Sequence, residues 1–365
     1  MEENKINFDF PLFIITLILI LMGLIMIMSA SGVKAYSQFG NAHFFFRRQL
    51  IFAIAGLFLM YITSLVDYKI YYRNSKKILL LSFILLVLVL IPGVGRTAGG
   101  ATRWIPLGLF DFQPSEVVKI ALIIYISSFL SRKRNKIRNL KKGIIPVLIV
   151  IMAIAFLIMQ QPDMGTAVNI IGFSFIILIA GGMKLKHLFF LSISGLFAII
   201  YYITSAPYRL NRVKTFLDPW KDPRGAGYHI IQSLIALGSG GLTGVGPGNS
   251  RQKFLYLPEP GTDFIFAILG EEFGLIGAVF VIILFGSFAY RGTLIALNAK
   301  DLFGTLLAVG ITAMIMIQFL INIGAVTSLL PVTGITLPFI SYGGSSLLIS
   351  LFSVGVLLNI SRQSM

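Results

Sequence analysis

The chain has 365 residues, of which 56% are hydrophobic and only 12% charged, with a formal net charge of +16. A soluble domain carries about 25% charged residues, so this composition excludes an ordinary soluble enzyme. The absence of cysteine excludes disulfides and cysteine-ligated metals. The basic residues lie between apolar runs, a pattern that indicates membrane topology, so we expect no nucleic acid among the partners.

Apolar runs long enough to cross a bilayer core of about 30 Å recur along the chain. The first is longer than a signal-peptide core and follows an acidic start, so we expect it to be retained. The sequence predicts an all-α fold, a single integral membrane domain over 1–365 with about ten transmembrane helices. The predicted spans lie near 10–30, 46–66, 77–92, 114–131, 143–160, 164–182, 187–204, 264–289, 301–324 and 338–360.

Basic residues alternate in density from one connecting segment to the next. They concentrate in segments such as 132–142 and are sparse around 96–103. The positive-inside rule therefore predicts that both termini are cytoplasmic. Residues 205–263 then form one large extracytoplasmic loop between helices seven and eight, and loops of this length tend to be functional.

The large loop contains two further patterns. Residues 227–237 are amphipathic, which predicts a helix lying at the membrane interface. The glycine-rich run 238–248 resembles a phosphate-cradling loop, but it lacks the strand–loop–helix context of such loops and is interpreted as turns.

Ionisable residues near or within spans are functional candidates because they are costly there. Glu116 and Lys119 are three residues apart and share a helical face, either as part of a site or as a structural ion pair. Asp163 and Asp263 each precede a predicted helix, so either could be an N-cap. The predicted topology places all four at the outer end of the bundle.

Two more features stand out. Glu271 and Glu272 fall inside the eighth span with no assignable role beyond facing the bundle interior. Residues 328–346 are apolar yet interrupted by prolines and a glycine pair. This stretch is either a kinked helix entry or irregular backbone, which is tolerated at membrane depth only where protein buries it or it lines a cavity.

The motifs in these regions resemble those of the SEDS family of bacterial envelope proteins (shape, elongation, division and sporulation), which includes FtsW, RodA and SpoVE. The segment 249–258 looks closer to the FtsW and SpoVE division–sporulation branch, whereas Gly261 stands where family members often carry His or Gln. The motifs are Arg103-Trp-Ile-Pro-Leu-Gly108, Gln113-Pro-Ser-Glu116, Gln161-Pro-Asp-Met-Gly-Thr166, Gly225-Ala-Gly-Tyr-His-Ile-Ile-Gln-Ser233, Tyr256-Leu-Pro-Glu259, Thr262-Asp-Phe264 and the run 331–346.

The resemblance implies a peptidoglycan glycosyltransferase that polymerises lipid II on the outer face of the bacterial cytoplasmic membrane, in cell division or sporulation. It places the essential aspartate at Asp263 and a supporting network at Glu116, Lys119 and Asp163. Such chemistry needs a base for the acceptor hydroxyl and positive charge for the departing undecaprenyl pyrophosphate. We expect Asp263 to be the general base of an inverting transfer.

Further candidates follow for substrate contacts. Arginine pairs well with phosphate oxygens, which suggests three arginines for the pyrophosphate. A divalent cation, Mg²⁺ or Mn²⁺, could assist them, and the sequence leaves this open. The candidate residues for pyrophosphate or substrate contacts are Arg103, Arg209, Arg212, Gln232, Ser233, Glu259 and Thr262.

The resemblance also implies partners: a class B penicillin-binding protein, which is a transpeptidase, and other divisome or elongasome membrane proteins. Two alternatives stay open at this point. A lipid II flippase would need a polar path to the inner leaflet. A non-catalytic divisome scaffold would leave Asp263 dispensable.

Overall fold

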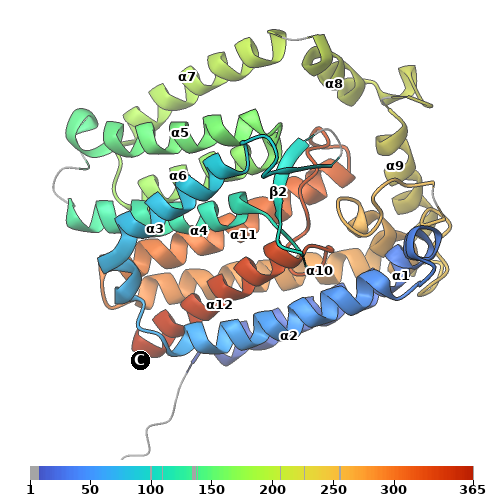
Figure 1. Cartoon of the computed structure of the whole chain (residues 1–365), viewed down its shortest axis with the longest axis horizontal. Coiled ribbons are helices and arrows are strands. Elements are labelled where there is room, and N and C mark those ends of the chain that lie inside the picture. Colours follow the sequence, from blue (N-terminus) through green and yellow to red (C-terminus); the bar gives the residue numbers. More distant parts are fainter. Residues whose placement is uncertain are drawn as a thin grey trace, which may run out of the picture.

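The computed structural model of the chain describes residues 8–98, 101–108, 110–133, 137, 139–205, 207–225, 227–254 and 256–364. Long helices run side by side along the long axis of the molecule (Figure 1). The helices are α1 (Phe10–Phe39), α2 (Phe44–Leu65), α3 (Lys69–Leu88), α4 (Pro114–Arg132), η2 (Leu140–Ile144), α5 (Ile145–Gln160), α6 (Met164–Ala180), α7 (Leu185–Thr204), α8 (Pro207–Leu217), η3 (Pro219–Lys221), α9 (Tyr228–Gly240), α10 (Ile265–Asn298), α11 (Leu302–Val326) and α12 (Gly344–Ser364).

Seven helical stretches in the described residues are long and apolar enough to cross a membrane. They are α1, α2, α4, η2 with α5, α10, α11 and α12, and α6 is a shorter apolar helix. The chain is therefore a predominantly helical, multi-pass membrane protein. Within the bundle α4 and α11 are central and mostly buried, whereas α2 is largely exposed on its outer side.

Local signals in the sequence explain where several helices begin. Asp9 caps α1 by accepting a hydrogen bond from the Leu12 amide at 2.9 Å, and Asp301 caps α11 through the Gly304 amide at 2.7 Å. A side-chain acceptor at this position satisfies one of the free amides of the first turn.

A small sheet between α3 and α4 was not expected for an all-α chain. It contains β1 (Arg96–Ala98), β2 (Ala101–Pro106) and β3 (Asp111–Phe112) in the antiparallel order β1-β2-β3. Strands of two to six residues are too short to show a clear alternation of apolar and polar residues, so the sequence pattern did not predict this sheet. Arg103 and Trp104 belong to its middle strand, β2.

The last predicted helix begins later than expected. The prediction placed its start at 338, whereas α12 begins at Gly344. The preceding residues 327–343 are irregular, and Phe339 has a φ of 64°. This backbone packs directly on α1, because a Cβ at Gly23 would lie 2.5 Å from the Phe339 carbonyl oxygen.

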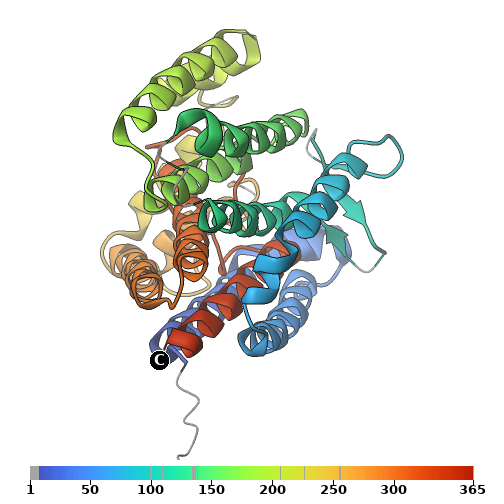
Figure 2. The same ribbon diagram turned by 90° about the vertical axis from the view of Figure 1, so that its left-hand side faces the viewer.

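The large loop contains its own helices. The expected amphipathic helix over 227–237 is α9, which packs against α10 and α11. Helix α7, before the loop, lies at the edge of the bundle in both views (Figures 1 and 2).

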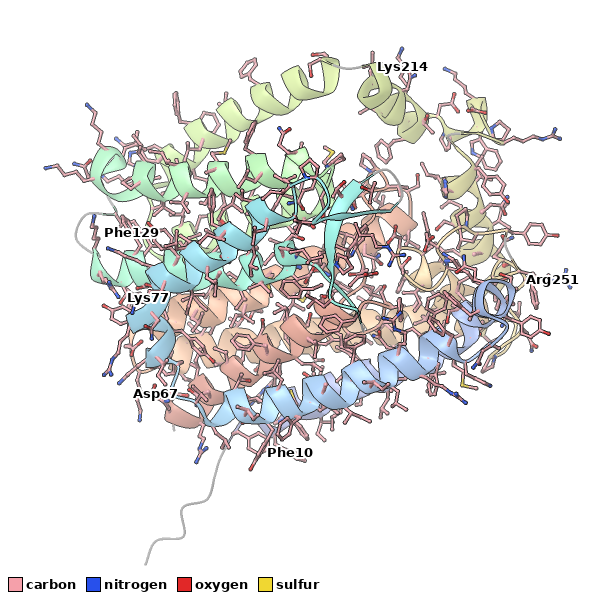
Figure 3. The ribbon with its side chains drawn as sticks, in the orientation of Figure 1. Phe10, Asp67, Lys77, Phe129, Lys214 and Arg251 are labelled. Atoms are coloured by element: carbon pink, nitrogen blue, oxygen red, sulfur yellow. The ribbon has the colours of Figure 1, made fainter. Side chains whose placement is uncertain are left out.

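The two ends of the bundle carry different parts of the chain. Asp67, Lys77 and Phe129 lie at one end, whereas Lys214 and Arg251 of the large loop lie at the other (Figure 3). The small sheet, α8 and α9 all lie toward the second end. A functional site at this end would therefore be built from the sheet, the large loop and the helix starts.

Candidate active site

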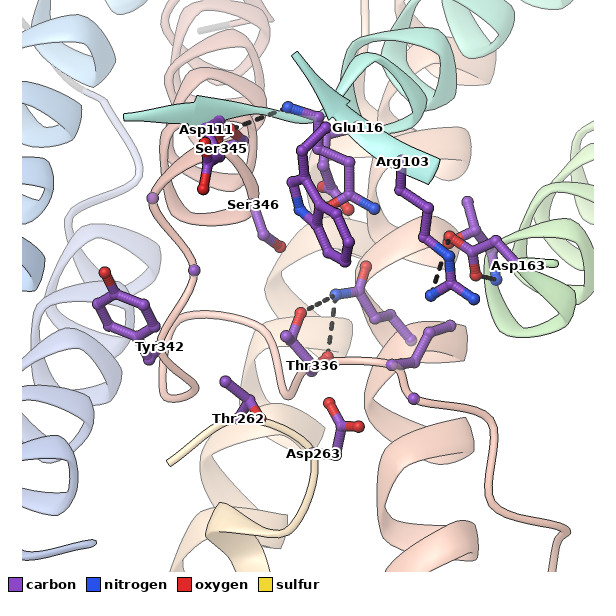
Figure 4. A pocket seen from close by; sticks show the side chains of 18 of the residues that line it. Arg103, Asp111, Glu116, Asp163, Thr262, Asp263, Thr336, Tyr342, Ser345 and Ser346 are labelled. Carbon is purple, nitrogen blue, oxygen red and sulfur yellow. Dashed lines mark hydrogen bonds and ion pairs between the residues drawn. The ribbon is translucent and has the colours of Figure 1, made fainter. Parts of the chain in front are cut away.

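A cavity of about 470 Å³ opens among the small sheet, α4, α6, α11 and the segments before α10 and α12. Glu116, Lys119, Asp163 and Asp263 all line it, although they come from three separate parts of the chain. Glu116, Asp163 and Asp263 are seen around it in Figure 4. Arg103, Glu259 and Thr262 line the same cavity. The expectation that the four charged residues share a cavity is therefore met by the geometry, while their chemical roles stay predictions.

A buried ion pair forms the inner wall of this cavity. Lys119 Nζ lies 3.0 Å from Glu116 Oε2 and donates to Gln318 Oε1 at 2.8 Å. The Gln318 amide donates in turn to the Thr336 carbonyl at 3.0 Å. Asn169 also donates to Gln318 Oε1, at 3.4 Å. The network thereby joins α4, α6, α11 and the irregular segment before α12.

Asp163 both caps a helix and takes part in the cavity wall. Its carboxylate accepts from the Thr166 amide at 3.1 Å and from the Thr166 hydroxyl at 2.9 Å. Arg103 Nη1 lies 3.9 Å from Asp163 Oδ2, and its Nε donates to the Gln161 carbonyl at 3.0 Å. Arg103 also donates to the Pro162 carbonyl. The direct charged partner of Asp163 is thus Arg103.

Asp263 is not an N-cap. The N-cap of α10 is Phe264, and no side chain caps that helix. The main chain at Asp263 is held instead, because Asn322 Nδ2 donates to the Asp263 carbonyl oxygen at 2.8 Å. Gly334, at a φ of 71°, lies beside the carboxylate, and a Cβ there would be 3.5 Å from Asp263 Oδ2. The carboxylate faces the cavity and receives no hydrogen bond from any residue within the described ranges.

The electrostatic surroundings of Asp263 favour its protonated form. Burial, followed by the charge of Glu259, raises the pKa of Asp263 from 3.8 to about 6. Asp163 also raises this pKa, whereas Arg103 and Lys34 lower it. An acid with such a pKa is still mainly ionised at neutral pH and is a stronger proton acceptor than an ordinary aspartate.

A second cavity, of about 910 Å³, adjoins the first. Both are lined by Arg103, Glu259 and Asp263, so these three residues stand where the cavities meet. The second cavity extends under α8 and α9, where its walls are more apolar and include Phe216 and Ile230.

His229 of α9 also lines the second cavity. Its ring stacks on Phe264 with centroids 6.2 Å apart and planes at 10°. Burial lowers the pKa of His229, so the ring is neutral at pH 7.

The remaining predicted contacts have three different outcomes. Gln232 and Ser233 line neither cavity, and the buried Ser233 hydroxyl donates to the Val326 carbonyl at 2.7 Å, which fastens α9 to the end of α11. Thr262 donates to the Glu259 carbonyl at 3.3 Å. The side chains of Arg209 and Arg212 lie outside the described residues, so their predicted role stays open.

Sequence reasoning missed several polar residues of the site. Gln318 and Asn322 are four residues apart inside an apolar span, which places both on one helical face and was a usable signal. Thr336 lies in the motif run 331–346, although no residue of that run was named for the site, whereas Arg48 had no comparable signal because only the folded chain brings it to the cavity.

The comparisons with known proteins agree on a family. The family model for FtsW, RodA and SpoVE, described as a cell cycle protein, matches residues 10–365. The chain is 50% identical over 364 residues to stage V sporulation protein E of Bacillus subtilis (strain 168), covering 100% of each chain. It is 44% identical to the probable peptidoglycan glycosyltransferase FtsW of Trichlorobacter lovleyi, covering 97% of this chain and 93% of that relative.

Solved structures have the same fold. A chain from a peptidoglycan synthase complex, described for the structural coordination of polymerization and crosslinking, is 28% identical with a TM-score of 0.80 and 98% of each chain covered. The rod shape determining protein RodA of Thermus thermophilus is 27% identical with a TM-score of 0.73, covering 99% of this chain and 98% of that one. The family expected from the motifs is therefore confirmed, and the chain belongs to the FtsW, RodA and SpoVE family of cell cycle proteins.

Proposed function

We propose that this chain is a peptidoglycan glycosyltransferase that polymerises lipid II into glycan strands on the outer face of the bacterial cytoplasmic membrane. Its family membership and its full-length similarity to probable peptidoglycan glycosyltransferases support the activity. The observation that carries the mechanism is that Asp263 lies where the two cavities meet. Its carboxylate has no hydrogen-bond partner among the described residues.

The reaction is a single displacement. Asp263 takes the proton from the 4-hydroxyl of the acceptor N-acetylglucosamine as that oxygen attacks C1 of the donor sugar. The bond between C1 and the phosphate oxygen breaks, and undecaprenyl pyrophosphate leaves with the electron pair. An α-linked donor gives a β-linked product, so one inversion suffices. A base with a pKa of about 6 suits this role because it lies near the operating pH.

Positive charge for the departing pyrophosphate comes from Arg103. It lines both cavities, and its hydrogen bonds to two backbone carbonyls and its pairing with Asp163 hold its guanidinium at their junction. Such preorganised charge stabilises a leaving group without reorganisation during the reaction. Arg209 and Arg212 on α8 are further candidates.

A divalent cation, Mg²⁺ or Mn²⁺, stays an additional proposal. No preformed group of three His, Asp or Glu side chains for a metal occurs among the residues with described positions. Mg²⁺ commonly binds through one or two carboxylates together with substrate phosphates. Glu259 lines both cavities and is the carboxylate that would hold the ion, which would supply further charge against the pyrophosphate.

The two cavities suit two lipid-linked substrates. The apolar walls under α8 and α9 fit a polyprenyl chain, and the polar first cavity fits the sugar and phosphate groups. Lys119, in the second turn of α4, and Gln318, in the C-terminal half of α11, both line the first cavity. The described residues that line the two cavities include none from α3, which carries Lys77 of the opposite end, and this favours surface chemistry over transport by a flippase.

We further propose ten membrane spans with both termini in the cytoplasm. A helix lies in each of the ten predicted ranges, and the C-terminus lies at the same end as Asp67 and Lys77 (Figures 1 and 3). The loop 205–263 then lies outside, on the side where lipid II is used.

A class B penicillin-binding protein is the proposed partner. The similar chain of a peptidoglycan synthase complex that coordinates polymerization and crosslinking supports this assignment. Other divisome or elongasome proteins would join through the same complex.

The test uses the full chain purified with its class B partner. Lipid II is supplied in liposomes and the products are separated on a gel. Native protein and D218N, a matched change at the exposed Asp218 of the large loop, should both make glycan strands. D263N should make none while keeping its partner and its thermal stability. A polymerising D263N would overturn the base assignment, and a native complex that moves lipid II across the bilayer without polymerising it would favour the flippase.

A further inference from the structure

A second buried charged cluster lies beside the candidate active site without lining either cavity. It contains Glu271 and Glu272 of α10 together with Lys253 of the large loop. Both glutamates are only 1% exposed. Burying charges is costly unless each is paired and hydrogen-bonded, so the partners of these groups show what the cluster holds in place.

Glu271 holds one turn of the large loop. Its carboxylate accepts from the Ser250 hydroxyl at 2.5 Å, the Arg251 amide at 2.9 Å and the Gln252 amide at 3.3 Å. Hydrogen bonds to an ionised acceptor are stronger than neutral ones. One side chain therefore fixes three successive residues, 250–252.

Glu272 joins the same turn to α1. Its carboxylate accepts from Lys253 Nζ at 3.0 Å, from the Ser29 hydroxyl at 2.5 Å and from the Ser250 amide at 3.4 Å. Lys253 Nζ donates to Ser29 Oγ at 3.0 Å as well. The turn is thus attached to α10 and α1 together.

The backbone of α10 also pairs with the large loop near Glu271 and Glu272. The helix is broken at Gly274, which has a φ of 64°. Residues 241–246 pair with backbone groups on either side of this break. The Val245 amide donates to the Glu271 carbonyl at 3.0 Å, and the Leu275 amide donates to the Gly241 carbonyl at 2.9 Å. A Cβ at Gly244 would lie 2.1 Å from the Glu272 carbonyl oxygen, so glycine permits the close approach.

The turn that Glu271 holds leads directly to the proposed base. The Leu257 amide donates to the Gln252 carbonyl at 2.9 Å, and the chain then runs to Asp263 immediately before α10. The segment before α10 is therefore attached to the helix twice: the turn 250–252 is bound to Glu271 in its second turn, and Asp263 leads into its first turn. Two further contacts with α1 lie along it: Lys34 Nζ is 2.6 Å from Glu259 Oε1, and a Cβ at Gly261 would be 3.3 Å from the Ser31 Cβ.

We propose that Glu271 is a positioning residue for Asp263, acting by fixing the turn 250–252 and thereby the course of the chain over 256–263. The carboxylate of Asp263 has no hydrogen bond of its own among the described residues, so the path of its backbone decides where it lies. The effect on catalysis rests on the proposed function, whereas the effect on the loop does not.

Two variants of the full chain test this, each against a matched control. E271Q keeps the size of the side chain but replaces one acceptor oxygen by an NH₂ group, so at least one of the three donors loses its acceptor. S250A removes the hydroxyl that donates to Glu271 and accepts from the Lys253 amide, and it serves as the test if E271Q does not fold. D301N is the control, because it makes the same carboxylate-to-amide change at the N-cap of α11, which follows the opposite end of α10.

Hydrogen exchange in detergent gives the readout that does not depend on activity. In E271Q and S250A the amides of 256–264 should exchange about tenfold faster than in the native protein, and D301N should leave them unchanged. Unchanged exchange over 256–264 in both variants, or equal acceleration in D301N, would overturn the proposal.

The pH profile of polymerisation supplies the second readout. A loosened loop exposes Asp263 to water, which removes part of the burial that raises its pKa. The acid limb of the polymerisation rate should therefore move to lower pH in both variants. Loss of folded protein alone would lower the rate without moving this limb. An acid limb that stays in place while the rate falls would overturn the positioning role. A native protein that makes no polymer would instead refute the proposed function and leave the exchange result standing. The charged groups facing Asp263 from the elements around it, unchanged in these variants, are Glu259, Asp163, Arg103, Lys34, Glu116, Lys119, Arg48 and Asp111.

Discussion

Lys119 and Glu116 form a buried ion pair at 3.0 Å, with side chains that are 3% and 7% exposed, on the inner wall of the candidate active site. Lys119 also donates to Gln318, so the pair fixes α4 relative to α11. The pair lines the same cavity as Asp263, and we expect it to shape that cavity rather than to receive the proton.

Removing only the lysine should be strongly destabilising. K119M leaves Glu116 buried without its cation, which costs about 3–5 kcal/mol in comparable cases. We expect a lower thermal unfolding temperature in detergent and no polymerisation. The double variant E116Q/K119M should recover most of the stability but not the activity. A double variant no more stable than K119M would show that the ion pair is not the structural unit proposed here.

Activity should fall as the pH drops through about 6, because protonated Asp263 cannot accept a proton. Glu259 raises the pKa of Asp263, so E259Q should move the acid limb of the rate to lower pH. Lys34 lowers the same pKa, so K34M should move that limb to higher pH. The measurement is the polymerisation rate between pH 5 and pH 8. Shifts in the same direction for both variants would contradict this electrostatic account.

Asp263 should reduce the stability of the protein at neutral and alkaline pH. Its folded pKa, about 6, lies above the ordinary 3.8, so its full contribution to stability is present below pH 3.8 and is lost as the pH rises through about 6. D263N should therefore be more stable than the native chain at pH 8, by roughly 1–3 kcal/mol, and nearly equal to it at pH 4. Thermal unfolding at the two pH values decides this. A less stable D263N at pH 8 would mean that the carboxylate makes favourable contacts when ionised.

Gly334 should not tolerate a side chain. Its φ of 71° strains any other residue, and an added Cβ would lie 3.5 Å from Asp263 Oδ2. G334A should lower the stability by about 1 kcal/mol and reduce polymerisation by at least tenfold. G286A serves as the control, because a Cβ at Gly286 of α10 meets nothing within 4 Å. Equal rates for G334A and the native chain would show that the space beside Asp263 is not used.

The apolar runs of the sequence determined the helical, multi-pass architecture, because a bilayer leaves a backbone few other ways to satisfy its hydrogen bonds. Local chemistry likewise determined the pairing of Glu116 with Lys119, since residues three apart share a helical face. The family motifs pointed to the charged residues that line the cavity.

Only the tertiary structure decided how those residues are held. Nothing local distinguishes Asp163, which caps a helix, from Asp263, whose carboxylate faces a cavity, because that difference is set by Gly334 and Asn322 from distant segments. The role of Glu271 was likewise invisible in the sequence, since its partners are some 20 residues away and are brought to it by the break at Gly274. A pattern within one helix reports which face is apolar. The partner that satisfies a buried charge comes from whichever segment folding places beside it.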